Sequence, residues 1–293
     1  MAFDRIKAEA TPIPDFNGAE DKTISYIISK PLAEAANIAI YLERPLIITG
    51  EAGTGKTALA FAVAAQLNMG PPLEFHCKSN SVGKDLLYQV DNMRRLYDAH
   101  AATKQIGDMA QYIGYAALGE AFLSELRRVV LIDEIDKTPR DFPNDLLNEL
   151  SRGQFMVPEI APNYCCVAKH RPVVIITSNS ERRLPTPFLR RCIYHHIAFP
   201  GASELHDIVA AHTQSMNLSS GFIQLAINRF LEIREIRQLS KQPSTDELIV
   251  WTQILRTLDV DNAALENTAL SKLPGLQVLI KNHEDLLLLE NKR

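Results

Sequence analysis

A glycine-rich segment near residue 50 has the residue types and the spacing that bind phosphate groups. It follows a short apolar run at residues 46–48 and precedes an alanine-rich stretch at residues 58–67. Glycines allow consecutive backbone N–H groups to point at phosphate oxygens, and the N-terminus of a following helix adds positive potential. A lysine can reach the terminal phosphates, and a threonine hydroxyl can bind Mg²⁺. We therefore predict a phosphate-binding loop made of Gly50, Glu51, Ala52, Gly53, Thr54, Gly55, Lys56 and Thr57.

Two acidic residues, Asp133 and Glu134, directly follow a second apolar run at residues 129–132. Because parallel strands end at a common edge where ligands bind, we expect both carboxylates to lie beside the phosphate loop. Phosphoryl transfer to water needs a ligand for the metal ion and a group that activates the water. We predict that Asp133 and Thr57 bind Mg²⁺ and that Glu134 is the general base.

Asn179 follows a third apolar run, at residues 173–177, after a single serine. Its amide is expected at the same edge of the sheet, where it could hold the attacking water or the γ-phosphate. The alternative interpretation is an Asx-turn, in which the side chain only shapes the end of a strand.

The order of these elements predicts an α/β fold. Strand-like apolar runs alternate with helical patterns up to residue 200, which is typical of a parallel sheet covered on both faces. Beyond residue 201 only helical periodicities remain. We predict a P-loop NTPase core with an N-terminal arm at residues 1–200, and an all-helical lid domain at residues 201–293. The first 17 residues lack a clear periodicity and are expected not to pack.

Taken together, the motifs are similar to those of the AAA+ ATPases. Residues 50–57, 129–136 and 177–179 carry the resemblance, and their order and spacing look like the MoxR branch. Segments at residues 45–50, 84–88, 188–192 and 241–248 also resemble MoxR-type sequences. The resemblance covers roughly residues 26–258. It implies an enzyme that hydrolyses ATP with Mg²⁺ in a hexameric ring or a helical assembly, and that remodels or activates a partner protein, often one with a von Willebrand A domain.

The resemblance also implies roles for cationic residues later in the chain. An arginine of one subunit commonly completes the neighbour's site, and Arg191 is the first candidate for this role, with Arg190 the second. An arginine that only complements a helix dipole is the alternative. The lid residue that senses nucleotide is usually an arginine in this superfamily. The corresponding stretch here departs from that pattern and offers Lys241.

Composition and charge narrow the function classes. A net charge of −4 and an isoelectric point of about 6.1 give no global positive field, which disfavours nucleic acid as a direct substrate. No apolar run approaches the ~18 residues of a membrane span, and no signal peptide is indicated, so we expect no membrane insertion and a cytoplasmic location. Two alternatives stay open, an ATP-dependent regulatory switch and a nucleic-acid-associated motor of the defence or restriction type. A single-step phosphotransferase fits the loop but not the acidic pair.

Overall fold

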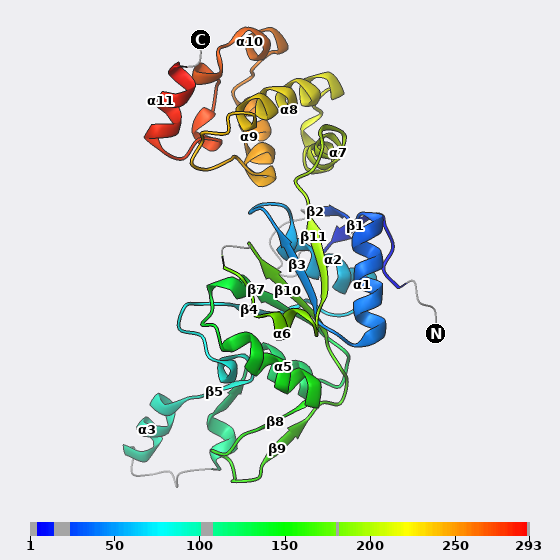
Figure 1. The fold of residues 1–293 in the computed structure, drawn as a ribbon, viewed down its shortest axis with the longest axis vertical. Coiled ribbons are helices and arrows are strands. Elements are labelled where there is room, and N and C mark those ends of the chain that lie inside the picture. Colours follow the sequence, from blue (N-terminus) through cyan, green and yellow to red (C-terminus); the bar gives the residue numbers. More distant parts are fainter. Residues whose placement is uncertain (1–4, 15–23, 101–107, 180–181, 292–293) are drawn as a thin grey trace.

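The computed structural model describes residues 5–14, 24–100, 108–179 and 182–291 (Figure 1). At its centre lies a five-stranded sheet whose neighbouring strands all run parallel. The strand order is β11 (Ile193–Ile197), β3 (Leu46–Gly50), β10 (Val173–Ser178), β7 (Val129–Asp133) and β4 (Leu73–His76). The three central strands are apolar runs buried on both faces, as helix-covered parallel sheets require. The predicted parallel-sheet fold is confirmed.

Helices cover both faces of this sheet, and alternate side chains of each strand face opposite layers. Ile48 and Leu131 lie in a cluster with α1 (Lys30–Leu42) and α2 (Lys56–Gln66). Ile47 and Ile132 lie in the opposite cluster, with α4 (Ala117–Leu123), α5 (Phe142–Arg152) and the short α6 (Thr186–Leu189). Burial of apolar side chains on both faces fixes the strands relative to one another, and with them the carboxyl edge of the sheet.

The N-terminal segment differs from the expected unpacked arm. β1 (Ala10–Ile13) pairs antiparallel with β2 (Ile24–Ile27), and the Ile6 side chain is only 2% exposed. The Asn37 side chain in α1 accepts hydrogen bonds from the backbone N–H groups of Arg5 and Ile6, at 2.9 and 2.8 Å, and donates one to the Ile6 carbonyl. These bonds replace the water contacts that the backbone of a free arm would make, so residues 5–14 belong to the core.

Two insertions extend from the end of the core that lies farthest from the C-terminal helices (Figure 1). The first contains η1 (Gly83–Leu86), β5 (Tyr88–Val90), α3 (Asn92–His100), η2 (Met109–Tyr112) and β6 (Ile113–Tyr115), with β5 and β6 paired antiparallel. The second is the hairpin of β8 (Gln154–Met156) and β9 (Cys165–Val167), which lies between α5 and β10. The short η3 (Ile135–Lys137) follows β7 directly.

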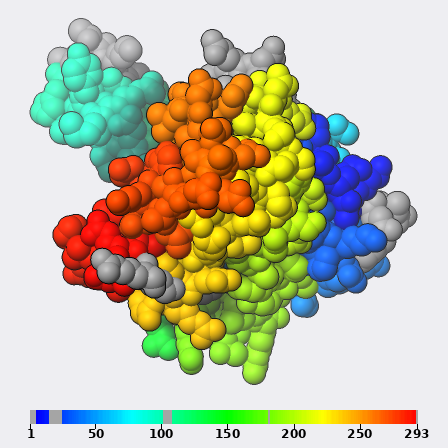
Figure 2. Space-filling view, turned by 90° about the horizontal axis from the view of Figure 1, so that it is seen from above, coloured from blue at the N-terminus to red at the C-terminus, as the bar shows by residue number. Residues whose placement is uncertain are grey.

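All described elements after β11 are helical. They are α7 (Ala202–His212), η4 (Gln214–Met216), α8 (Ser220–Arg234), α9 (Thr245–Thr257), α10 (Asn262–Asn267), η5 (Leu270–Lys272), η6 (Leu276–Val278) and α11 (His283–Asn291). They share a hydrophobic core of their own, in which Trp251 is fully buried and donates its Nε1–H to the Pro274 carbonyl at 2.8 Å. Figure 2 shows this helical unit, yellow to red, covering the core when the molecule is seen from above. Whether it moves as a lid stays a prediction.

Candidate functional site

The predicted phosphate loop connects the end of β3 with the start of α2. Gly53 and Gly55 have φ angles of +74° and +80°, in the left-handed region that glycine adopts without strain. A Cβ atom at Gly53 would lie 2.7 Å from the Ser244 Cβ, and one at Gly55 would lie 2.8 Å from a ring carbon of Tyr26. Glycine is therefore required at both positions for the turn itself and for the close approach of the loop to β2 and α9.

Lys56 begins α2, and its residue is only 6% exposed. Its Nζ donates to the carbonyls of Gly50 and Glu51, at 3.0 and 2.7 Å, so the ammonium group is held inside the loop. Burial lowers the pKa of Lys56, and the nearby carboxylates, Asp133 foremost, oppose this shift. A buried ammonium group enclosed by loop backbone is well placed to bind the oxygens of a phosphate.

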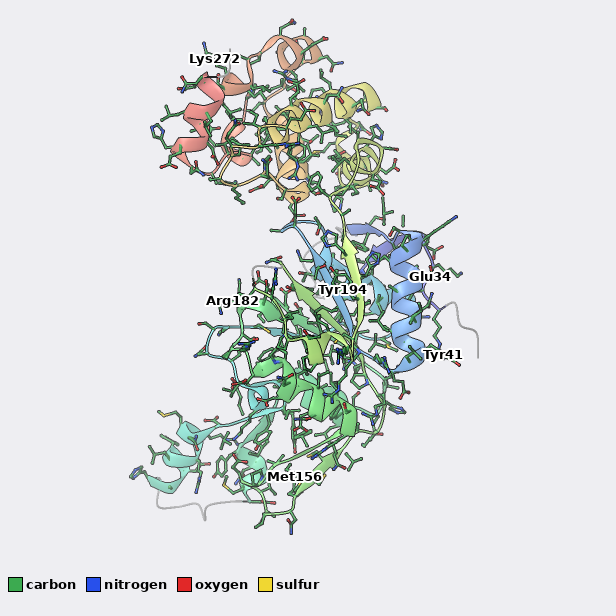
Figure 3. The ribbon with its side chains drawn as sticks, viewed as in Figure 1. Glu34, Tyr41, Met156, Arg182, Tyr194 and Lys272 are labelled. Carbon is green, nitrogen blue, oxygen red and sulfur yellow. The ribbon has the colours of Figure 1, made fainter. Side chains whose placement is uncertain are left out.

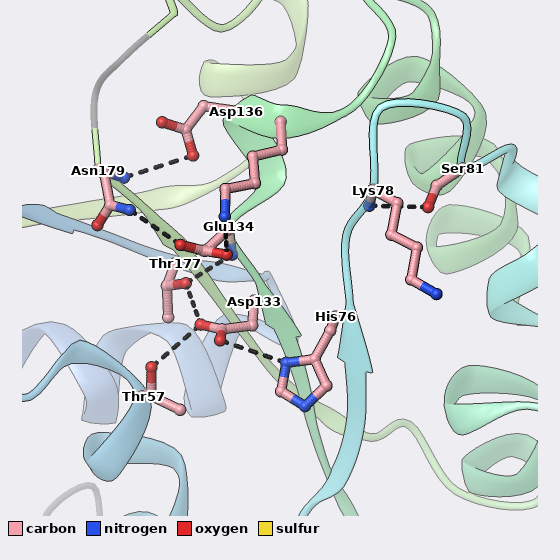
Figure 4. Close-up of polar contacts among 10 residues, drawn as sticks. Thr57, His76, Lys78, Ser81, Asp133, Glu134, Asp136, Thr177 and Asn179 are labelled. Carbon is pink, nitrogen blue, oxygen red and sulfur yellow. Dashed lines mark hydrogen bonds and ion pairs between the residues drawn. The ribbon is translucent and has the colours of Figure 1, made fainter. Parts of the chain in front are cut away.

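Asp133 ends β7 and is held from three sides (Figure 4). Its Oδ1 accepts hydrogen bonds from Thr57 Oγ1 at 3.1 Å and from Thr177 Oγ1 at 2.6 Å. The His76 Nδ1 lies 3.4 Å from the other carboxylate oxygen. Thr57 and Asp133 thus present a hydroxyl and a carboxylate oxygen side by side, which is the hard-oxygen chemistry that Mg²⁺ prefers.

The described residues contain no group of three or more His, Cys, Asp and Glu side chains able to hold a metal ion by itself. Nucleotide-bound Mg²⁺ does not need one, because one or two protein oxygens suffice when the phosphates and water supply the other ligands. The Thr57 and Asp133 pair therefore fits Mg²⁺ that arrives with a nucleotide.

Glu134 follows Asp133 in a left-handed conformation, with a φ of +57°. Such a conformation is uncommon for a residue with a side chain and costs about 1 kcal/mol or more, so its surroundings must hold it in place. Its N–H donates to Thr177 Oγ1 at 2.9 Å, and its Oε1 accepts from Asn179 Nδ2 at 3.2 Å. Its second carboxylate oxygen forms an ion pair with Lys137. The turn therefore separates the two neighbouring carboxylates and places Glu134 beside Asn179.

A cavity of about 290 Å³ gathers most of the predicted residues at the carboxyl edge of the sheet. Its lining includes Lys56, Thr57, Asp133, Glu134 and Asn179. A second cavity, of about 670 Å³, lies beside it and shares Gly53, Gly55, Ala58 and Asp246 with the first. Its walls come from β2, the start of α1, β11 and the helical unit, together with the phosphate loop, and none of the residues outside the loop was predicted from the sequence to line a site.

Five predicted residues do not line either cavity within the described part of the chain: Gly50, Glu51, Lys241, Arg190 and Arg191. Lys241 Nζ lies 2.9 Å from Glu247 Oε1 in α9, so its charge is directed at the helical unit. Arg190 and Arg191 are exposed and lie between α6 and the start of β11. Since β11 runs parallel to β3 and Ile197 pairs with Gly50, Arg191 precedes the opposite end of β11, which spans about 13 Å at ~3.3 Å per strand residue.

The comparison with known families agrees with this geometry. The model of the AAA domain (Cdc48 subfamily) matches residues 43–233, which span the whole sheet and the first helices after it. The chain belongs to this AAA family of P-loop ATPases.

Solved structures that resemble this AAA domain include the FIGL-1 AAA domain in complex with ADP. It is 16% identical, with a TM-score of 0.43, and the match covers 84% of this chain and 70% of that one. The Thermotoga maritima RuvB Holliday junction branch migration motor is 15% identical, with a TM-score of 0.40, and the match covers 81% and 70% of the two chains. No curated protein matches the chain. No helix within the described ranges is long and apolar enough to cross a membrane.

Asp246, near the start of α9, is a residue of this AAA domain that the sequence analysis missed. It lines both cavities. A Cβ atom at Gly53 would lie 3.1 Å from the Oδ2 atom of Asp246. Its side chain is accessible from the cleft, yet partial desolvation there raises its pKa, while His212 and Lys56 oppose the shift. A negative charge so close to the loop repels an anionic ligand.

Replacing Asp246 by asparagine is therefore expected to tighten the binding of a nucleoside triphosphate about fivefold, from a screened repulsion of about 1 kcal/mol. The charge-conserving Asp246→Glu is the matched control. Because the pKa of Asp246 is raised, the wild-type residue loses its charge at a higher pH than an ordinary aspartate. The difference between wild type and Asp246→Asn should accordingly be largest where the carboxylate is fully ionised, and should shrink as the pH falls through the raised pKa, in calorimetric titrations. Weaker binding by Asp246→Asn would instead show that the carboxylate contacts the ligand favourably.

Proposed function

We propose that this AAA domain binds ATP with Mg²⁺ and hydrolyses it to ADP and phosphate. The observation that carries the proposal is the single cavity lined by Lys56, Thr57, Asp133, Glu134 and Asn179. A phosphate-binding ammonium, a pair of oxygen ligands for the metal, a base and an amide thereby meet at one edge of the sheet. This is the set of groups that hydrolysis of a phosphoanhydride requires.

The two adjoining cavities suit the two ends of a nucleotide. The smaller one, with the loop amides and Lys56, suits the phosphates. The larger one is lined by apolar residues such as Ile27, Leu32 and Ile249 together with a few polar groups, which suits a purine base. A nucleotide that spans both cavities contacts the core and the helical unit at once, so its binding would depend on how these two parts are placed.

The residues of the cavity define the chemical step. Thr57 and Asp133 would hold Mg²⁺, which when bound neutralises charge on the β- and γ-phosphates. Glu134 accepts a proton from the attacking water while the water oxygen bonds to the γ-phosphorus and the bond to the bridging oxygen breaks, so that ADP leaves. Asn179 orients the Glu134 carboxylate through its amide N–H. Thr177 orients both acidic residues, because it donates to Asp133 and accepts from the Glu134 N–H.

We propose further that the enzyme acts as a head-to-tail oligomer. Arg191 lies before β11, at the end of the sheet opposite its own phosphate loop, which supports a role in the site of another subunit. Its exposed guanidinium would stabilise charge on the neighbour's γ-phosphate, with Arg190 as the second candidate. A contact of this kind closes into a hexameric ring or continues as a helical assembly, depending on the rotation between subunits.

The proposal also includes membership of the MoxR branch, a lid role for residues 201–293 and remodelling of a partner protein. The support is the series of MoxR-type segments in the sequence, together with a helical unit that has its own core and reaches the phosphate loop through α9. A partner with a von Willebrand A domain and a cytoplasmic location belong to the same proposal. The net charge of −4 disfavours DNA or RNA as the direct substrate.

The test is calorimetric titration of the folded protein with ATP in the presence of Mg²⁺, followed by an assay of phosphate release without a second substrate. Replacing Lys56 by alanine is expected to weaken ATP binding about 10- to 100-fold, because a charge-assisted contact to phosphate is lost. Lys272→Ala, at an exposed site in the helical unit, is the matched control and should bind ATP like the wild type. A folded wild-type protein without measurable affinity for Mg-ATP would refute the proposal.

A further inference from the structure

Arg234, the last residue of α8, extends from the helical unit to the phosphate loop. Its Nη2 donates to Glu51 Oε2 at 2.8 Å, across 183 residues of sequence. Its Nη1 donates to the Pro243 carbonyl, and its guanidinium lies 3.4 Å from the centroid of the Phe199 ring. The arginine side chain is 12% exposed, so these contacts largely enclose it.

The partners of Arg234 come from three segments at the junction between the helical unit and the core. Phe199 lies in the link between β11 and α7. Pro243 precedes Ser244, the N-cap of α9, and the Ser244 side chain packs directly against Gly53. Glu51 belongs to the phosphate loop itself. A planar guanidinium can stack on a ring and donate in two directions at the same time, whereas the ammonium group of a lysine cannot do so.

Glu51 is also linked to Lys56, the residue that we assign to the phosphates. The backbone carbonyl of Glu51 accepts a hydrogen bond from Lys56 Nζ at 2.7 Å, while its carboxylate holds Arg234. A bound phosphate would compete with this carbonyl for the ammonium group, because an anion is the stronger acceptor. Glu51, which shares the Lys56 ammonium group with the Gly50 carbonyl, is thus both a residue whose backbone contact nucleotide binding would replace and the residue that holds the helical unit.

We propose that Arg234 is a positioning residue that couples the helical unit to the phosphate loop through Glu51. This inference rests on the proposed function, since it takes the ligand of the loop to be ATP. It also assigns Arg234, in place of Lys241, as the cation of the helical unit that is linked to the phosphate loop. Arg234 contacts the Glu51 carboxylate, while Lys241 contacts Glu247. The arginine acts through the loop and does not itself contact the phosphates.

The test compares Arg234→Lys with a matched control in the same helix. Arg229 is similarly enclosed, at 13% exposed, but its partners, Glu232 and the Thr268 carbonyl, lie within the helical unit. Arg234→Lys and Glu51→Gln are each expected to lower kcat about tenfold, the equivalent of one charge-assisted hydrogen bond. Arg229→Lys should change kcat less than twofold. If Arg234 and Glu51 act as one contact, the double variant should be no slower than the single variants.

A second measurement reports the coupling directly. Dyes at Glu34→Cys on α1 and Lys272→Cys on the helical unit (Figure 3), in a background with the exposed Cys165 changed to serine, give an energy-transfer signal between the two parts. The signal should change when ATP is added to the protein with Arg234, and the change should fall by at least half with Arg234→Lys but not with Arg229→Lys. Equal responses of these two variants would overturn the inference. So would a double variant whose loss of kcat equals the product of the losses in Arg234→Lys and Glu51→Gln.

A third measurement needs no nucleotide, which separates this inference from the proposed function. Backbone amide hydrogen exchange in the phosphate loop should be at least threefold faster in Arg234→Lys than in Arg229→Lys. Thermal melting curves check that both variants are folded. If the wild type fails to bind ATP, the proposed function fails, and the exchange data still decide whether Arg234 holds the loop. Identical exchange in the two variants would show that it does not.

Discussion

Glu134→Gln is expected to lower the rate of ATP hydrolysis about 100- to 10,000-fold, the usual contribution of a general base, while ATP binding is retained. Glutamine keeps the size of the side chain and an oxygen that can accept the Asn179 hydrogen bond, but it cannot take a proton from water. Phosphate release under saturating ATP measures the first effect, and titration with ATP and Mg²⁺ measures the second. The variant should therefore accumulate in its ATP-bound form.

A matched control for this substitution is Glu120→Gln, at an exposed position of α4 outside both cavities. It makes the same chemical change and should leave turnover within about twofold of the wild type, as surface substitutions away from a site usually do. Hydrolysis by Glu134→Gln at the wild-type rate would show that another group activates the water. Loss of ATP binding in Glu134→Gln would show instead that the glutamate is needed to maintain the cavity.

Arg191→Ala is expected to reduce turnover about 1,000-fold, within the range of a catalytic arginine supplied by a neighbour, with little change in ATP affinity. The arginine would act only on the charge that develops during transfer, so the ground-state complex should not need it. Steady-state kinetics and nucleotide titration on the assembled protein measure the two quantities. Arg190→Ala, one position earlier and also exposed, is the matched comparison and should have the smaller effect.

Mixing variants decides whether Arg191 acts across an interface. An Arg191→Ala subunit keeps Glu134, and a Glu134→Gln subunit keeps Arg191, so a mixed assembly regains complete sites. Equimolar mixtures are expected to recover part of the turnover that neither variant has alone. If the mixture stays inactive although mixed assemblies form, Arg191 does not act on the neighbouring site. A larger loss with Arg190→Ala would transfer the role to Arg190.

The sequence could predict the phosphate site because each part of it follows a buried strand. The apolar runs that became β3, β7 and β10 are long enough to recognise, and parallel strands must bring their ends to one edge. The sequence alone thus predicts that Lys56, Asp133 and Asn179 lie at one edge of the sheet. The proximity of these residues follows from topology alone, whereas their roles remain proposals.

Other features depended on contacts that leave no local pattern. The Arg234 and Glu51 pair joins segments 183 residues apart, and neither residue has unusual neighbours in the sequence. Asp246 lies beside Gly53 only because α9 is placed over the loop by the packing of the helical unit. The strand β1 was missed because it contains Pro12 and is held by pairing with β2, not by an alternating apolar pattern.

The separate hydrophobic cores of the sheet and the helical unit have a thermodynamic consequence for motion. No buried apolar residue in the described ranges belongs to both interiors. Rotating one part over the other would therefore leave both interiors packed, and the nonpolar cost, at ~25 cal/mol per Å², would come only from surface exposed at the junction. Polar contacts at the junction can be exchanged for contacts with water at about 1 kcal/mol each. The interactions that a single triphosphate can make are thus strong enough to change the orientation of the two parts.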